Sequence, residues 1–184
     1  MRRAMSLAAV MFFLAFDSTR GEVASGPAVG EKLAPFKAHV LGEGGNFSEA
    51  DIVTDRGDKP TIYAFVRADR WDRPQARFLK NLDGVMEKHS AEAVCVVVWL
   101  TANIDESKEY LPRMNQSLQF QRSRLTVFSG DATGPEGWGI NGDAFVTVVV
   151  AAGGKSAATM GLVSTNEGDV PKVEEALGKA VRSK

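Results

Sequence analysis

FVRADRWDRPQARFL, residues Phe65–Leu79, is the stretch that decides the fold, because in it a buried strand runs into the first turn of a helix. The residues that lead into it, KPTIYAFV, are rich in β-branched and aromatic side chains, which predicts a central strand. From Gln75 onward apolar side chains recur every three or four positions, which predicts an amphipathic helix. The sequence therefore predicts a strand–turn–helix unit whose turn is rich in arginine.

Downstream of this unit, strands and helices continue to alternate. AVCVVVWLT (Ala93–Thr101) is almost entirely apolar, as strands that are covered on both faces usually are. A helical stripe follows, in which Pro112 predicts a kink or a late start, and RLTVF then predicts another strand. In the glycine-rich loop after it, Trp138 is expected to pack inward as an anchor. A hairpin should turn at Gly153–Gly154, and Asp169 should be the N-cap of the last helix.

Upstream of the unit, the chain predicts a hairpin. Phe36, Ala38 and Val40 alternate with polar neighbours, as in a strand, and a glycine-rich turn and a return strand follow. The whole order is β-β, β-α-β-α-β, β-β-α, which predicts an α/β protein with helices covering a mixed sheet.

The composition and net charge argue against some classes of partner. The 184 residues are 44% hydrophobic and 24% charged, with a net charge of −1, which is typical of a globular protein with a real core. This charge balance does not favour nucleic acid or an acidic membrane surface as a partner.

The N-terminal residues predict a signal peptide. Arg2 and Arg3 precede an apolar run, Ala4–Phe16, which is too short to span a bilayer but typical of an export signal. Cleavage is expected at Val23–Ser25 or near Gly21; the alternatives are an uncleaved anchor and a buried helix. We therefore predict a signal peptide over residues 1–25 and one domain over residues 26–184. The mature protein would be periplasmic or secreted, without a membrane partner.

Cysteine and histidine are scarce in this chain. Cys95 is the single cysteine of the sequence, so no internal disulfide and no CxxC motif can form. His39 and His89 lie in different predicted elements, so no zinc site is recognisable. We expect neither a metal nor a cofactor.

Three segments carry a resemblance to a known family. VGEKLAPF, from Val29, resembles the family's opening segment, and TIYAFV resembles its strand before the active site. GWGINGDAFVTVVVAAGGK resembles the segment that holds a conserved threonine–proline, a strand and a glycine turn in that family. The chain thus resembles the thioredoxin-like superfamily, in its redoxin and peroxiredoxin-like branch, over about Val29–Val181. The resemblance implies a central mixed β-sheet flanked by helices, with an N-terminal β-hairpin extension.

The chain departs from this family at the residues that perform its chemistry. Laid on the family pattern, the two redox cysteines fall at Arg70 and Arg73, with Trp71 and Asp72 between them. A guanidinium cannot attack a disulfide or a peroxide, because a thiolate is the nucleophile in this chemistry. The family's cis-proline, which shapes its substrate groove, falls at Ala144, where a cis peptide is costly. These departures predict that the usual redox reaction is lost.

Cys95 lies in the middle of an apolar predicted strand. Burial should raise the pKa of its thiol, so we expect it to act as a small hydrophobic side chain of the core. The alternatives are a reactive thiol and a thiol that joins two copies of the chain.

The arginine-rich turn has three interpretations. Arg67, Arg70, Arg73 and Arg77 recur at intervals of three or four, with aspartates interleaved. They could pair with these aspartates on a solvated face, form an anion site at the helix N-terminus, or serve as a protein-binding epitope together with Trp71.

Three hypotheses on function follow. The first is an exported thioredoxin-fold protein without redox catalysis, which binds an unknown protein or a small anionic ligand through the Arg70–Arg73 turn. The second is an atypical thiol oxidoreductase or one-cysteine peroxidase that uses Cys95. The third is a structural accessory domain without a ligand.

Overall fold

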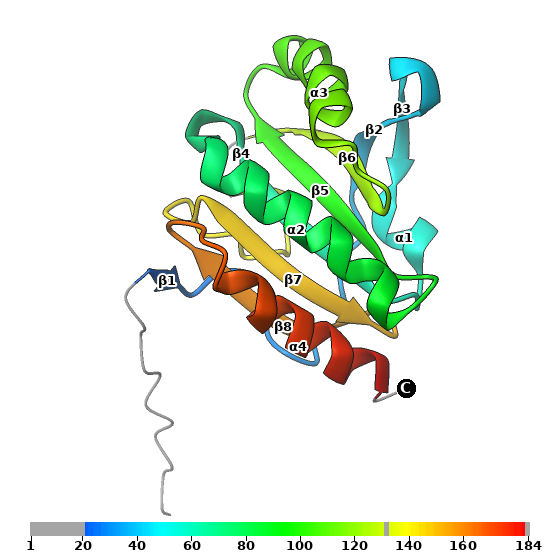
Figure 1. Cartoon of the computed structure of the whole chain (residues 1–184), viewed down its shortest axis with the longest axis vertical. Helices are drawn as coiled ribbons and strands as arrows, with labels where there is room; N and C mark the ends of the chain where they lie inside the picture. The colour runs from blue at the N-terminus through cyan, green and yellow to red at the C-terminus, as the bar shows by residue number, and fades with distance from the viewer. Residues whose placement is uncertain (1–20, 131–132, 183–184) are drawn as a thin grey trace, which may run out of the picture.

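The structure, a computed structural model, describes residues 21–130 and 133–182. Its strands form one sheet with the order β1-β8-β7-β4-β5-β6-β2-β3 (Figure 1). The strands are β1 (Glu22–Val23), β2 (Lys37–Leu41), β3 (Phe47–Asp51), β4 (Thr61–Arg67), β5 (Val94–Thr101), β6 (Ser123–Ser129), β7 (Val146–Ala152) and β8 (Lys155–Leu162). The helices are α1 (Ile52–Arg56), α2 (Arg73–His89), α3 (Ile104–Leu118) and α4 (Asp169–Arg182), with short 3₁₀ turns η1 (Glu43–Gly45) and η2 (Ala68–Arg70).

The centre of the sheet is parallel and its flanks are antiparallel. β4, β5 and β6 lie side by side in parallel, connected by α2 and α3. The connections β4–α2–β5 and β5–α3–β6 cross the sheet in the same direction. Because such connections are right-handed, α2 and α3 lie on the same face of the sheet. α4 lies beside α2 on that face, as Figure 1 shows. The β7–β8 hairpin pairs with β4, and the β2–β3 hairpin pairs with β6. The mixed sheet flanked by helices and the N-terminal hairpin are thus confirmed.

The sheet is buried on both faces, which explains the uninterrupted apolar run of β5. Cys95, Val97 and Trp99 contribute to the core beneath the helices, and Val96 and Val98 contribute to a second core on the opposite face. Because successive side chains of a strand point to opposite faces, a strand between two cores needs apolar residues at every position.

The second core is closed without a long helix. Trp138, from the glycine-rich loop, is fully buried there, and its indole Nε1 donates a hydrogen bond to the carbonyl of Ala34 at 3.0 Å. The Trp138 ring packs against Phe36, Tyr63 and Phe65, with ring centroids 4.9–5.3 Å away. The prediction that Trp138 is an inward anchor is confirmed.

Two helix starts differ from the predictions. α3 begins at Ile104, because the Asn103 side chain accepts a hydrogen bond from the Glu106 N–H at 3.3 Å. The helix continues through Pro112, so the prediction that it starts late, at this proline, is wrong. Asp169 lies inside the first turn of α4 and is not the N-cap. The Asn166 side chain instead accepts from the Gly168 N–H at 2.8 Å, and the Asp169 carboxylate accepts from the Asn166 N–H at 2.9 Å.

Candidate functional site

The turn between β4 and α2 is locked by a capping box. The Asp72 carboxylate accepts a hydrogen bond from the Gln75 N–H at 3.0 Å, and the Gln75 side chain accepts one from the Asp72 N–H at 3.1 Å. Pro74 in the first turn fixes a helical backbone where no N–H is needed. The Asp72 carboxylate is therefore the N-cap of α2, so a side chain of the protein itself occupies this helix start.

Arg67 holds the strand end to the turn and to a distant loop. Its guanidinium donates two hydrogen bonds to the Asp69 carboxylate, at 3.0 and 2.6 Å, and a third to the carbonyl of Gly142. Its side chain is only 15% exposed. The hydrogen bond from Arg67 is the main reason that the pKa of Asp69 lies below its ordinary value. Arg67 is thus committed to internal contacts.

Arg70 lies beside the position that the family resemblance assigns to a cis-proline. Its guanidinium is stacked 5.3 Å from the centroid of the Phe145 ring, a favourable cation–π arrangement, and it is 3.9 Å from the Asp69 carboxylate. The neighbouring Ala144 is buried, and its N–H donates to the Asn141 carbonyl at 3.1 Å. Residues 21–130 and 133–182 contain no cis peptide bond.

Trp71 joins an aromatic cluster that brings three elements together. Its indole Nε1 donates a hydrogen bond to the hydroxyl of Tyr110 in α3 at 2.7 Å. The rings of Trp71 and Tyr110 pack against Trp99 of β5, with centroids 5.1 and 5.8 Å away. Trp99 is buried, whereas Trp71 and Tyr110 are half-buried, so each presents part of an aromatic surface to solvent.

This cluster lines a hollow of about 690 Å³ at the carboxyl ends of β4 and β5. Open α/β sheets commonly bind ligands at that edge. Asp69 and Glu106 provide carboxylates to the lining, and Thr101, Asn103 and Ser107 provide neutral polar groups. The Ser107 hydroxyl contacts the Thr101 hydroxyl at 2.9 Å, which fixes the start of α3 against the end of β5. The site combines aromatic surface with an acidic and polar rim.

The arginines of the turn do not converge on one point. Arg67 lines the hollow at the end of β4, whereas Arg73 and Arg77 line a second hollow of about 300 Å³ on the outer side of α2, together with Lys80. All three of these α2 cations are exposed. Arg73 and Arg77 share one face of α2, because residues four positions apart lie side by side on a helix, whereas Arg67 lies at the end of β4.

Cys95 is remote from this site. It lies near the start of β5, whereas the hollow is at the end of that strand. Cys95 is 0% exposed, and burial raises the pKa of its thiol to about 12. A one-cysteine enzyme needs an accessible and acidic thiol. The thiol of Cys95 is neither accessible nor acidic in this structure.

No group of three potential metal ligands occurs among the described residues. His89 ends α2 with its Nε2 3.4 Å from the Glu174 carboxylate, and His39 lies in β2. No helix in residues 21–130 and 133–182 is long and apolar enough to cross a membrane. The predicted signal peptide falls mostly on residues 1–20, outside the described residues.

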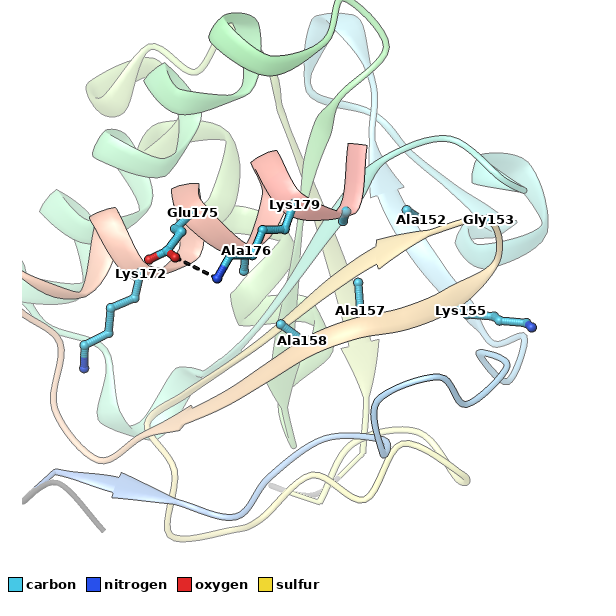
Figure 2. A pocket seen from close by; sticks show the side chains of 10 residues that line it. Ala152, Gly153, Lys155, Ala157, Ala158, Lys172, Glu175, Ala176 and Lys179 are labelled. Atoms are coloured by element: carbon cyan, nitrogen blue, oxygen red, sulfur yellow. Dashed lines mark ion pairs between the residues drawn. The ribbon is translucent and has the colours of Figure 1, made fainter. Parts of the chain in front are cut away.

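A further hollow, of about 600 Å³, lies between α4 and the β7–β8 hairpin (Figure 2). Its floor is made of alanines from β8 and α4, so small side chains account for the space. Lys172 points away from it and pairs with Glu22 at 2.7 Å, and Lys179 pairs with Glu175 at 2.7 Å. These charged groups are already engaged, and nothing at this hollow resembles a reactive centre.

Sequence reasoning found Arg67 and Trp71 but missed the opposite wall of the site. Trp99 lies in the apolar run that predicts a covered strand, and Tyr110 lies in the helical stripe that follows this run. Position is the signal that could have found this wall. Thr101 ends a buried parallel strand and Asn103 comes shortly after it, and side chains there meet the end of the neighbouring strand.

Comparisons with known proteins support the fold. No protein-family model and no curated protein matches the chain. Among solved structures, a DsbF homologue from Corynebacterium diphtheriae aligns with a TM-score of 0.61 at 15% identity, over 88% of this chain and 96% of that one. A secreted thiol-disulfide isomerase from Corynebacterium glutamicum gives 0.60 at 13% identity, over 92% and 98% of the two chains. A thiol peroxidase from Chromobacterium violaceum gives 0.59 at 12% identity, over 89% and 93%.

Proposed function

We propose that this chain, which has the thioredoxin-like fold of the redoxin and peroxiredoxin-like branch, is an exported binding module that performs no redox catalysis. The observation that carries the proposal is the absence of a nucleophile at the β4–α2 junction. Arg70 and Arg73 occupy the positions that the resemblance assigns to cysteines, and the single thiol of the sequence is buried elsewhere.

The chemistry of the buried thiol supports the same conclusion. Thiol–disulfide exchange and peroxide reduction both begin with attack by a thiolate. Burial raises the pKa of the Cys95 thiol to about 12, so the thiol is protonated at neutral pH. Full burial also keeps a disulfide or a peroxide away from the sulfur atom.

The hollow at the strand ends supports a binding role. Trp71 and Tyr110 offer flat apolar surface, which favours the burial of an aromatic or aliphatic group. Its rim is polar: the Asp69 carboxylate accepts hydrogen bonds from Arg67, and the Asn103 amide donates one to the Glu106 carboxylate at 3.0 Å. A shaped aromatic surface without a reactive group is suited to holding a partner rather than transforming it.

Export is part of the proposal. It rests on the signal-like pattern of residues 1–20 and on neighbours such as the secreted isomerase from Corynebacterium glutamicum and an exposed lipoprotein thioredoxin from Streptococcus pneumoniae. A periplasmic or secreted location follows from this proposal.

Two assays test the absence of catalysis. We expect the purified mature protein to leave insulin disulfides intact in the presence of dithiothreitol and to consume no hydrogen peroxide with a thiol donor. The matched control is Cys95→Ala, which should behave like the wild type in both assays. Turnover by the wild type that disappears in Cys95→Ala would overturn the proposal and establish the one-cysteine enzyme.

A further inference from the structure

Three hollows on the helical side of the molecule adjoin one another along α2 and α3. The hollow at the strand ends shares Trp71 and Tyr110 with a second one of about 300 Å³, between α2 and α3. The second hollow shares Arg73, Ala76 and Leu118 with the third, which is also about 300 Å³. We call this the α2–α3 groove; it runs from the end of β5 to the outer side of α2.

The two ends of the α2–α3 groove differ in charge. Asp69 and Glu106 line the end at the strands together with Arg67, which is paired with Asp69. Arg73, Arg77 and Lys80 line the other end, where Glu167 is the one acidic side chain of the described lining. An occupant with carboxylates toward α2 would therefore match the groove in charge.

The guanidiniums at the basic end lack partners. Within the part of the chain that the structure describes, the side chains of Arg73 and Arg77 form no hydrogen bond and no ion pair, although Arg67 and Arg70 both contact Asp69. Cations near a helix N-terminus oppose the helix dipole, and like charges four residues apart repel each other. The first turn of α2 contains no acidic residue that would offset this. An anion supplied by another molecule would therefore stabilise Arg73 and Arg77 in these positions.

The floor of the groove indicates what kind of molecule carries the anion. Ala76, Met114 and Leu118 line the middle section together with Trp71 and Tyr110, and the polar side chains of Asp72 and Ser117 also line it. A free phosphate could neutralise Arg73 and Arg77 but would leave this apolar and aromatic surface unused. An extended polypeptide can cover all three sections at once, with alternate side chains reaching the floor and the charged walls.

We propose that the α2–α3 groove binds an extended acidic segment of a partner protein, with carboxylates on Arg73 and Arg77 and apolar side chains against Leu118 and Trp71. This inference rests on the proposed binding function and names its class of partner. The contact uses side chains of α2 and not its first-turn N–H groups, one of which Asp72 already occupies.

Fluorescence anisotropy with a short labelled peptide, in which glutamate alternates with leucine, tests this proposal. We expect binding that weakens as salt is added, and a loss of about tenfold in affinity in Arg73→Gln/Arg77→Gln. The matched control is Arg113→Gln/Arg124→Gln, which removes two exposed arginines outside the groove and should bind like the wild type. A peptide with lysine in place of glutamate should not bind.

Several results would overturn the inference. These are no binding of the acidic peptide by the wild type, an equal loss in both double variants, or displacement of the peptide by inorganic phosphate at the same concentration. Its failure is distinguishable from failure of the proposed function, because the redox assays do not depend on the peptide. An inactive protein that binds no acidic peptide refutes this inference alone, whereas turnover that requires Cys95 refutes the proposed function alone.

Discussion

Trp71 and Tyr110 are joined by a hydrogen bond of 2.7 Å from the indole N–H to the phenol hydroxyl, across 39 positions of the chain. This contact fastens the β4–α2 turn to α3 where the first two hollows of the α2–α3 groove meet. Tyr110→Phe should therefore lower the free energy of unfolding by about 1 kcal/mol, since a hydrogen bond between neutral groups contributes about that much.

Urea denaturation of Tyr110→Phe, Trp71→Phe and the double variant measures this contact. The double-mutant cycle isolates the pairwise energy. Purely additive losses would show that the hydrogen bond contributes nothing to stability.

The capping box at Asp72 predicts a second loss of stability. Asp72→Ala removes the acceptor for the Gln75 N–H and should cost about 1 kcal/mol in the free energy of unfolding, whereas Asp72→Asn should retain most of it. Thermal and urea unfolding provide the measurement, with Asp143→Ala as the matched control on an exposed loop carboxylate. If Asp72→Ala and Asp143→Ala are equally stable, the cap has no energetic role.

The buried position of Cys95 predicts how its thiol reacts and how the stability of the native protein depends on pH. A thiol reagent such as dithionitrobenzoate should react with the protein only after denaturation. The unfolded thiol has a pKa of about 8.5 and the folded one a pKa of about 12, so between these values the unfolded state loses a proton that the native state keeps. Native stability should therefore fall as the pH rises through that window. Rapid labelling of the native protein near neutral pH would contradict the buried position.

The Arg67–Asp69 pair predicts that a single substitution changes the pKa of Asp69. The pKa of the Asp69 carboxyl is lowered chiefly by its hydrogen bond from Arg67 and less by Arg70. Arg67→Gln should raise the pKa of Asp69 toward its ordinary value, and Arg70→Gln should raise it less. Carboxyl-carbon NMR titration compares the two variants. Because the folded pKa is depressed, the contribution of the pair is present at neutral pH and lost as the pH falls through the acid range.

Processing of the N-terminus is the last prediction. The Ser25 hydroxyl lies 2.6 Å from the Thr147 hydroxyl and accepts from the Asn141 N–H at 2.9 Å, and Glu22 and Val23 pair with β8. Of the two cleavage positions that the sequence predicts, we therefore expect the one near Gly21 and not the end at Ser25, because cleavage after Ser25 removes all of these contacts. Intact-mass measurement of the exported protein identifies the site. A version that begins at Gly26 should be less stable by about 1–2 kcal/mol.

The sequence predicted elements whose signals are local and missed contacts that depend on distant residues. The apolar run at Cys95 and the glycine pair at Gly153–Gly154 each specify a strand or a turn within a few residues. The partner of Trp71, by contrast, is on another helix, and no periodicity indicates it. The assignment of Asp169 as a cap failed for a related reason, because Asn166 and Asp169 both suit a helix start and only the surrounding backbone decides between them.

The buried Trp138 also affects how the chain reaches its native state. Its indole hydrogen bond to Ala34 spans 104 positions, so the second core closes only when the N-terminal segment and the glycine-rich loop dock together. Contacts between such distant segments carry a large loop-closure cost and slow down folding. Until both segments are in place, the strand face that carries Tyr63 and Phe65 is open to water, and in that interval the chain is most exposed to aggregation.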